Sequence, residues 1–366
     1  MHCLVVRIFT GLSFIGLAGL PSAVSAQVGL DPMWQRVSPA LDRFEIAVPL
    51  NPMGRAAVLQ ALEELTRERC DETAIVNLGK ALQAAGQRRD AANAHVRFSA
   101  TCGGRSESLQ SAANIFLGIA DFERAAEAAT AMTALEPLND NGYFLRAVAY
   151  DRSGQASKAV DDYTTAIELF TQKDRIADVS FVGLARNYEK MGQPCDAAAA
   201  IESWVAINPS RYDTAKTRSI IAGYESKGKC ASATAGKEEV FARARRGEVV
   251  TLPVTINGVP GRLMLDTGAS FVSLKASFAA KAKVEIDQES KIQLYTANGI
   301  SEGRRGRAAA IQVRSLRAND VPLVVQTDAK GTYGPGVDGL LGMSFLSRFH
   351  VTLDGKSVRI RKRAER

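Results

Sequence analysis

The sequence predicts a multidomain protein in which an N-terminal α-helical array precedes an all-β barrel. Residues 70–236 are rich in Ala, Leu, Glu, Lys and Arg and repeat a pattern of small and aromatic residues, which favours stacked helix hairpins. From residue 249 onward, apolar residues recur with a period of two between turn signals, which favours strands. Of the 366 residues, 46% are hydrophobic and 23% are charged, so we expect an ordinary globular chain.

The first 26 residues predict a cleaved secretory signal peptide. Arg7 precedes an apolar run, and the small residues Val24 and Ala26 favour cleavage before Gln27. The run is short for a membrane span, and an uncleaved membrane anchor is the alternative. We therefore expect an exported protein whose mature part begins with a partly helical extension over residues 27–69.

The helical segment contains an internal repeat. Its copies begin near residues 72, 106, 140 and 178, and a shorter copy closes the segment. This spacing is close to the ~34 residues of tetratricopeptide repeats, whose small and aromatic positions the copies resemble. The recurring positions include Ala91, Phe98, Ala125, Met132, Ala159, Ala166, Ala197 and Trp204. Such arrays often present a concave face to a protein ligand, whereas a purely scaffolding or dimerising role is equally open.

Four cysteines remain after signal removal, and their even number in an exported protein favours disulfides. Cys70 precedes the first helix of a predicted hairpin and Cys102 ends its antiparallel partner, so we expect these two to pair. Cys195 and Cys230 lie at equivalent turns of adjacent repeats, which favours a second bond, with buried free thiols as the alternative. Neither the cysteine spacing nor the two remaining histidines favour a metal site, and no cofactor is expected.

The charged segment 237–248 predicts a linker, and residues 249–366 predict the β domain. Two strands flank an Asn-Gly turn at 257–258, and the second strand ends at Asp266. The run VPLVVQT predicts another strand, and FHVTLDGKSVRIR predicts a closing hairpin with an Asp-Gly turn. The basic C-terminal tail lacks interleaved aromatic residues, so no nucleic-acid site is expected despite the net charge of +7.

The segment RLMLDTGAS contains the residues with the clearest chemical meaning. Peptide hydrolysis without a metal or a side-chain nucleophile needs one carboxylate to activate water and a second carboxylic acid to protonate the carbonyl oxygen. Asp266 supplies such a carboxylate, the Thr267 hydroxyl can bond to a partner loop, and Gly268 permits close backbone approach. The chain contains no second Asp-Thr-Gly.

Three motifs resemble, in this order, the retropepsin-like aspartic proteases, particularly their single-lobe bacterial members. They are the LDTGAS loop, the hairpin YTANGISEG and the run VDGLLGMSFL. The resemblance implies that Asp266 is catalytic and that a second copy of the chain supplies the other Asp across a two-fold axis. It further implies that the active-site loop continues through Thr267, Gly268, Ala269 and Ser270. The implied flap contains Tyr295, Thr296, Ala297, Asn298 and Gly299, and the implied supporting turn contains Leu340, Leu341 and Gly342.

The resemblance therefore predicts an aspartic endopeptidase that acts on peptide or protein substrates as a homodimer, and the signal peptide predicts export to the bacterial periplasm. The chain departs from the retroviral pattern at Met343, which stands where an Arg usually braces the dimer, and its flap has fewer glycines. Asp338 is a second acid nearby in sequence, but it lacks the following Thr and is expected to be a turn or helix-cap residue.

A function from a different class competes with this one. The chain can be a helical-repeat binding scaffold whose β domain is a catalytically silent dimerisation module. The intact Asp266-Thr267-Gly268 favours the enzyme, because a silent copy has no physical need of an acid in that loop. A serine hydrolase is not expected, since only two histidines remain after signal removal.

Overall fold

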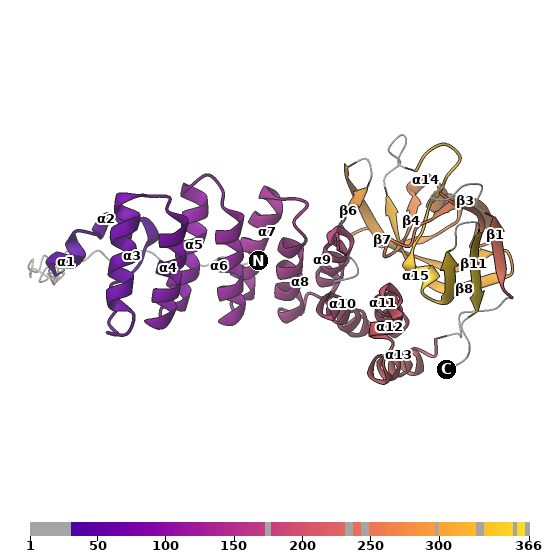
Figure 1. Ribbon diagram of the computed structural model, residues 1–366, viewed down its shortest axis with the longest axis horizontal. Coiled ribbons are helices and arrows are strands. Elements are labelled where there is room, and N and C mark those ends of the chain that lie inside the picture. Colours follow the sequence, from indigo (N-terminus) through magenta and orange to yellow (C-terminus); the bar gives the residue numbers. More distant parts are fainter. Residues whose placement is uncertain are drawn as a thin grey trace, which may run out of the picture.

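The computed structural model describes residues 31–172, 177–230, 237–242, 249–296, 299–326, 333–353 and 357–362. Antiparallel helices form an elongated row, and a β-rich domain follows at its C-terminal end (Figure 1). The predicted order of a helical array followed by a β-rich domain is therefore confirmed. The predicted signal peptide, residues 1–26, lies outside the described residues. Among the helices that are described, none is long and apolar enough to cross a membrane.

Helix pairs recur at the predicted spacing, with first helices that begin at residues 72, 106, 140 and 178. The pairs are α4 (Glu72–Ala84) with α5 (Arg88–Thr101), α6 (Ser106–Gly118) with α7 (Phe122–Leu135), α8 (Asp140–Arg152) with α9 (Ala156–Leu169), and α10 (Asp178–Lys190) with α11 (Pro194–Ile207). They are flanked by α1 (Pro32–Gln35), α2 (Ser38–Phe44), α3 (Arg55–Arg67), α12 (Pro209–Tyr212) and α13 (Ala215–Gly228). Because α3 packs against α4, the helix packing begins before the boundary expected at residue 70.

Small residues let neighbouring helices cross closely. A Cβ atom added at Gly79 in α4 would lie 2.4 Å from Nε2 of His95 in α5. One added at Gly183 in α10 would lie 2.4 Å from the ring of Tyr163 in α9. Protein interiors are close-packed, so a larger side chain at either position would push the two helices apart. The small residues of the repeat therefore follow from the distance between the helices.

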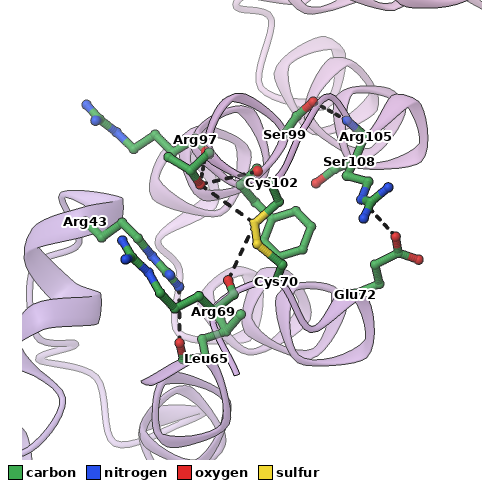
Figure 2. Close-up of a disulfide and its surroundings, with 12 residues drawn as sticks. Arg43, Leu65, Arg69, Cys70, Glu72, Arg97, Ser99, Cys102, Arg105 and Ser108 are labelled. Carbon is green, nitrogen blue, oxygen red and sulfur yellow. Dashed lines mark hydrogen bonds and ion pairs between the residues drawn. A yellow bond between two sulfur atoms is a disulfide. The ribbon is translucent and has the colours of Figure 1, made fainter. Parts of the chain in front are cut away.

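Two disulfides lie at helix ends. Cys70 is bonded to Cys102, as the helix-hairpin argument predicted, and Cys195 is bonded to Cys230, as their equivalent turn positions predicted, with Cα atoms 5.6 Å apart in each pair. Figure 2 shows the first bond between the segment before α4 and the end of α5. Beside this bond, the Arg105 guanidinium forms an ion pair of 3.0 Å with the first residue of α4.

The β domain contains one large and one small sheet. The large sheet has the order β2-β3-β9-β4-β8-β7-β5, with β6 paired to β7 and a further pairing between β2 and β7. Its strands are β2 (Thr251–Ile256), β3 (Val259–Leu265), β4 (Val272–Lys275), β5 (Glu285–Ile286), β6 (Ile292–Thr296), β7 (Gly299–Val313), β8 (Leu316–Gln326) and β9 (Gly339–Leu341). Alternate residues of β2, namely Leu252, Val254 and Ile256, are buried in the core.

The β2–β3 hairpin turns at an Asn-Gly pair, as the sequence predicted. Asn257 and Gly258 have φ angles of 49° and 86°, and both lie in the left-handed region. A two-residue hairpin turn of this kind needs positive φ at both central positions, which Asn and Gly adopt at low cost. The turn thereby fixes the register in which β3 delivers Asp266 to the end of the strand.

The prediction of a linker over residues 237–248 is wrong in part, because Glu239–Ala242 forms strand β1. β1 pairs with β11 (Ser357–Lys362), which also pairs with β10 (Phe349–Leu353), and the three strands form the small sheet. Phe241 is buried in the core of the domain, and the Glu239 carboxylate accepts a hydrogen bond of 2.6 Å from Ser315. A four-residue strand with one buried residue is too short to show a period of two in the sequence.

The helical row and the β domain share a hydrophobic cluster. Four buried residues of the β domain, Phe271, Ile292, Leu294 and Val324, belong to the same cluster as residues of α9, α10 and α11. α9 packs against β6, and α11 packs against β8 and α15 (Met343–Leu346). In Figure 1, α9 lies next to β6 at the junction. The two domains are therefore joined by a common core.

Charged side chains reinforce this junction. The Arg307 guanidinium in β7 pairs with both carboxylate oxygens of Asp196 in α11, and Nη1 lies 2.8 Å from Oδ1. Asp196 is 1% exposed, so the pair crosses the interface inside the protein. A cavity of about 250 Å³ adjoins the pair, between the α10–α11 turn and strands β5 and β7. None of the predicted site residues lines this cavity.

Candidate active site

The loop between β3 and β4 carries the Asp-Thr-Gly tripeptide. The backbone N–H of Gly268 donates a hydrogen bond of 2.8 Å to Oδ1 of Asp266. Asp266 is half-buried, whereas Thr267 and Gly268 are exposed. The N–H group fixes the orientation of the carboxylate, because hydrogen bonds to an ionised acceptor are among the stronger ones. The exposed side of the loop is free to face a substrate or a second protein chain.

Strand β9 supports the loop from behind. It lies between β3 and β4, parallel to β3 and antiparallel to β4. The N–H of Asp266 donates a hydrogen bond of 3.2 Å to the carbonyl of Leu341. Leu341 is fully buried in the domain core, and Leu340 is half-buried. The structure thus places both leucines in the strand next to the end of β3.

The first turn of α15 holds the far side of the same loop. The N–H of Met343 donates to the carbonyl of Ala269 at 2.8 Å, and the N–H of Ser344 donates to the carbonyl of Ser270 at 3.0 Å. The Ser344 hydroxyl also accepts a hydrogen bond of 2.9 Å from the N–H of Val272. Residues 269, 270 and 272 are therefore held by hydrogen bonds to the backbone and side chain of residues 343–344. Sequence reasoning did not single out Ser344, which the structure shows to be buried.

Two glycines permit this close packing. A Cβ atom at Gly342 would lie 2.1 Å from the carbonyl oxygen of Phe271 and 2.8 Å from that of Ala269. A Cβ atom at Gly339 would lie 1.9 Å from the carbonyl oxygen of Ser273. Protein atoms do not approach this closely, so both positions need glycine for space. Gly342 is thus required by the contact between the β9–α15 segment and the Asp-Thr-Gly loop.

The second predicted motif forms a β-hairpin of β6 and β7. The pairs next to its tip are Tyr295 with Ile300 and Thr296 with Gly299. The predicted tip residues Ala297 and Asn298 lie outside the described residues. Ile300 is 46% exposed, so an apolar side chain is accessible beside the tip.

The start of β7 reads Gly-Ile-Ser-Glu-Gly at residues 299–303, which matches the G-x-S-x-G letters of a serine-hydrolase motif. In the structure these residues form a continuous strand, and Ser301 lies opposite Leu294 of β6. The serine-hydrolase motif requires a sharp turn from a strand into a helix. The letters in this chain therefore describe one strand of a hairpin.

Asp338 lies away from the Asp-Thr-Gly tripeptide and joins two strands. Its Oδ2 accepts a hydrogen bond of 2.9 Å from the N–H of Arg262, and its own N–H donates to the Arg262 carbonyl at 2.8 Å. The expected turn or helix-cap role is thus replaced by a contact that aligns β9 with β3. Met343, at the position of the usual dimer-bracing Arg, is half-buried against the domain core.

A buried polar network near the loop was missed by sequence reasoning. The Ser273 hydroxyl lies 2.8 Å from the Tyr333 hydroxyl, and Nε2 of Gln326 donates to the same Ser273 oxygen at 2.7 Å. Polar residues inside otherwise apolar strands are the signal that indicates such a network. In the described part of the chain, no group of three or more His, Cys, Asp or Glu residues is arranged to hold a metal ion.

Comparison with protein families addresses the region that contains this loop. Residues 252–345 match the family model for aspartyl proteases. The matched segment runs from β2 to α15 and includes the Asp-Thr-Gly loop, the β6–β7 hairpin and β9. Residues 252–345 are therefore similar in sequence to aspartyl proteases. No curated protein matches the chain.

Solved structures resemble separate parts of the chain. A retropepsin-like aspartic protease from Rickettsia conorii is 24% identical, with 34% of this chain and 98% of that chain covered and a TM-score of 0.27. MamA from Desulfovibrio magneticus is 17% identical, with 49% and 94% covered and a TM-score of 0.37. A thermophilic TPR protein from Thermus thermophilus is 16% identical, with 52% and 98% covered and a TM-score of 0.33.

Proposed function

We propose that this protein is an exported aspartic endopeptidase in which two chains each contribute Asp266 to one active site. The observation that supports this most directly is the loop geometry. The Asp266 carboxylate is held by the Gly268 N–H, while Thr267 and Gly268 are exposed. Among the described residues, no other carboxylate is hydrogen-bonded to Asp266. A second copy of the chain, related by a two-fold axis, would supply the missing acid.

The chemistry follows from two carboxyl groups in contact. Like charges at this distance cannot both ionise, so the pair shares one proton. The ionised Asp266 takes a proton from water, and the water oxygen attacks the peptide carbonyl carbon. The partner's Asp266 donates its proton to the carbonyl oxygen, which gives a neutral tetrahedral intermediate. Its collapse breaks the C–N bond, and the amine leaves with a proton returned by the pair.

The rest of the chain supports export and delivery of substrate. Disulfides persist in oxidising compartments, so the two cysteine pairs support export to the periplasm after removal of residues 1–26. In this proposal residues 27–69 are an extension and residues 70–236 form the repeat domain. The repeat domain is built on a helical row of the kind that commonly binds peptides and proteins. Its substrate or protein ligand would then be presented to the protease domain of the same chain.

The decisive experiment replaces the proposed catalytic acid. Asp266→Asn should abolish hydrolysis of a peptide library while the far-UV circular dichroism stays that of wild type, because Asn cannot activate water. Asp338→Asn is the matched control, since its side-chain oxygen can still accept from Arg262, and it should keep most of the activity. Hydrolysis by Asp266→Asn, or its loss only in Asp338→Asn, would contradict the assignment.

Stoichiometry provides an independent test. Activity per chain should fall on dilution below the dimer dissociation constant, because one chain carries one catalytic acid. Excess Asp266→Asn chains mixed with wild type should depress activity through mixed dimers, provided that subunits exchange. The pH profile should be bell-shaped and report the two apparent pKa values of the pair. Undiminished activity of a monomer at every dilution would show that both acids lie in one chain.

A further inference from the structure

β6 is the outer strand of the flap hairpin, and in the described structure its strand partner is β7. The other edge of such a strand leaves N–H groups that need partners. Helix α9 lies along this edge (Figure 1). The N–H of Gln293 donates a hydrogen bond of 3.1 Å to Oγ1 of Thr165, and the N–H of Lys291 donates one of 3.2 Å to Oδ2 of Asp161. Helix side chains thus take the place of a neighbouring strand.

The two acceptor residues on α9 and the two N–H groups at β6 are spaced by nearly the same distance along their elements. Residues four apart on a helix are separated by about 6 Å along its axis. Residues two apart on a strand are separated by about 6.6 Å. Asp161 and Thr165 are four apart, and the N–H groups that they accept belong to residues 291 and 293. The helix therefore matches the strand in register at two consecutive contacts.

Asp161 also contacts the second strand of the hairpin. Its Oδ1 accepts a hydrogen bond of 2.8 Å from the Ser290 hydroxyl and lies 2.7 Å from Nε of Arg305 in β7. The Arg305 guanidinium further bonds to Asp287 at 2.5 Å and to the Ser157 hydroxyl of α9 at 2.8 Å. One carboxylate of the helical row therefore binds the residue before β6 and the middle of β7 together.

The neighbouring residues of α9 have different contacts. Asp162 pairs with Arg146 of α8, at 2.7 Å and 2.8 Å, and so binds within the helical row. The Thr164 hydroxyl is buried and has no hydrogen-bond partner among the described residues. The polar residues of α9 are thus divided by position: Asp161 and Thr165 accept from backbone N–H groups at β6, and Ser157 accepts from the Arg305 side chain of β7.

The helical row also reaches the active-site loop. Phe271, five residues after Asp266, and Leu294 of β6 both lie in the hydrophobic cluster shared with α9, α10 and α11. The same helices are therefore in contact with the segment that follows Asp266 and with the hairpin proposed to cover it. The distance between loop and hairpin is set in part by these helices, because packed cores do not deform continuously.

We propose that α9 positions the flap hairpin over the active site, with Asp161 and Thr165 as positioning residues for substrate binding. The helical repeats are then part of the peptidase machinery as well as a surface for protein ligands. The proposal rests on the proposed function, since a flap has a role only above a catalytic loop. The proposal predicts that loss of the Gln293–Thr165 hydrogen bond weakens substrate binding, whereas a change at the neighbouring Thr164 does not.

The first test measures the hairpin directly in the full chain. Thr165→Val removes the acceptor at constant shape, and hydrogen exchange of amides in residues 291–296 should become about fivefold to tenfold faster. Thr165→Ser should restore the wild-type rate, because it keeps the hydroxyl. Thr164→Val is the matched control and should leave these amides unchanged. Equal exchange in Thr165→Val and Thr164→Val would overturn the proposal.

The second test measures substrate binding. Thr165→Val should raise KM about threefold to tenfold with kcat within about twofold, because a lost hydrogen bond weakens the hold on the hairpin and leaves the carboxylates in place. Asp161→Asn should act in the same direction, whereas its control Asp162→Asn should leave KM unchanged. Faster exchange with unchanged KM would show that α9 holds the hairpin without positioning it, which contradicts the proposal. A wild-type protein inactive on every peptide would instead sink the proposed function, and the exchange rates would still decide the helix–hairpin contact.

Discussion

Because the imidazole of His95 is buried, we expect the free energy of unfolding of the helical row to fall in acid. His95 lies in α5 and is 3% exposed, with Nδ1 3.0 Å from the Ser108 hydroxyl of α6. Its Nε2 faces Gly79 of α4, where a Cβ atom would come within 2.4 Å. Burial disfavours the charged imidazolium and lowers the pKa of His95 from 6.5 to about 4.

The sign of the effect follows from proton binding. The unfolded chain takes up the proton near pH 6.5, whereas the folded protein takes it up only near pH 4. Between these values the unfolded chain binds more protons, so the free energy of unfolding falls as the pH falls. At about 1.4 kcal/mol for each pH unit, the contribution that His95 loses across this interval is about 3 kcal/mol.

Urea unfolding followed by far-UV circular dichroism measures this contribution. His95→Gln does not titrate, so the stability difference between wild type and variant should shrink by about 2–3 kcal/mol between pH 7 and about pH 4. His350→Gln is the control, because His350 is exposed in β10 and its replacement should leave the wild-type pH dependence intact. Parallel pH profiles for wild type and His95→Gln would refute the burial argument.

Three further substitutions test the fold that carries the site. Replacing Cys70 and Cys102 by Ser opens a bond across 32 residues and should lower the free energy of unfolding by about 3–4 kcal/mol, measurable by urea titration against the oxidised wild type. Gly342→Ala places a Cβ atom against the Phe271 carbonyl, so it should cost at least about 2 kcal/mol and reduce activity by moving the loop, and a wild-type thermal midpoint would contradict this. Arg307→Met leaves a buried carboxylate of α11 unpaired and should cost about 3 kcal/mol at neutral pH by the same titration, with an unchanged midpoint as the contrary result.

Local patterns in the sequence were sufficient for much of the fold. The repeat starts at residues 72, 106, 140 and 178 coincide with the beginnings of α4, α6, α8 and α10. The Asn257-Gly258 turn and the pairing of Cys70 with Cys102 followed from turn chemistry and from antiparallel helix geometry. Each of these signals is contained within one turn or one helix hairpin, so no knowledge of distant segments was needed. The Asp-Thr-Gly loop was visible for the same reason.

The segment Glu239–Ala242 shows where local patterns failed. Its residues read as a charged connector, yet they form β1 because β11, more than a hundred residues later, supplies hydrogen-bond partners. The prediction for Asp338 failed for the same reason, because its carboxylate accepts a hydrogen bond from the N–H of Arg262, which lies in β3 and comes close only in the folded chain. In both cases the partner is too distant in sequence for any local pattern to contain it.

The sequence by itself determined the helical repeat, the period-two β domain and a single acid at the end of a strand. Only the tertiary structure decided that Asp161 faces the flap hairpin while the adjacent Asp162 faces α8. Successive residues on a helix point about 100° apart, so identical neighbours acquire different partners according to what packs on each side. The contact between Asp161 and the Ser290 hydroxyl spans 129 positions, and only the packing of the two domains creates it.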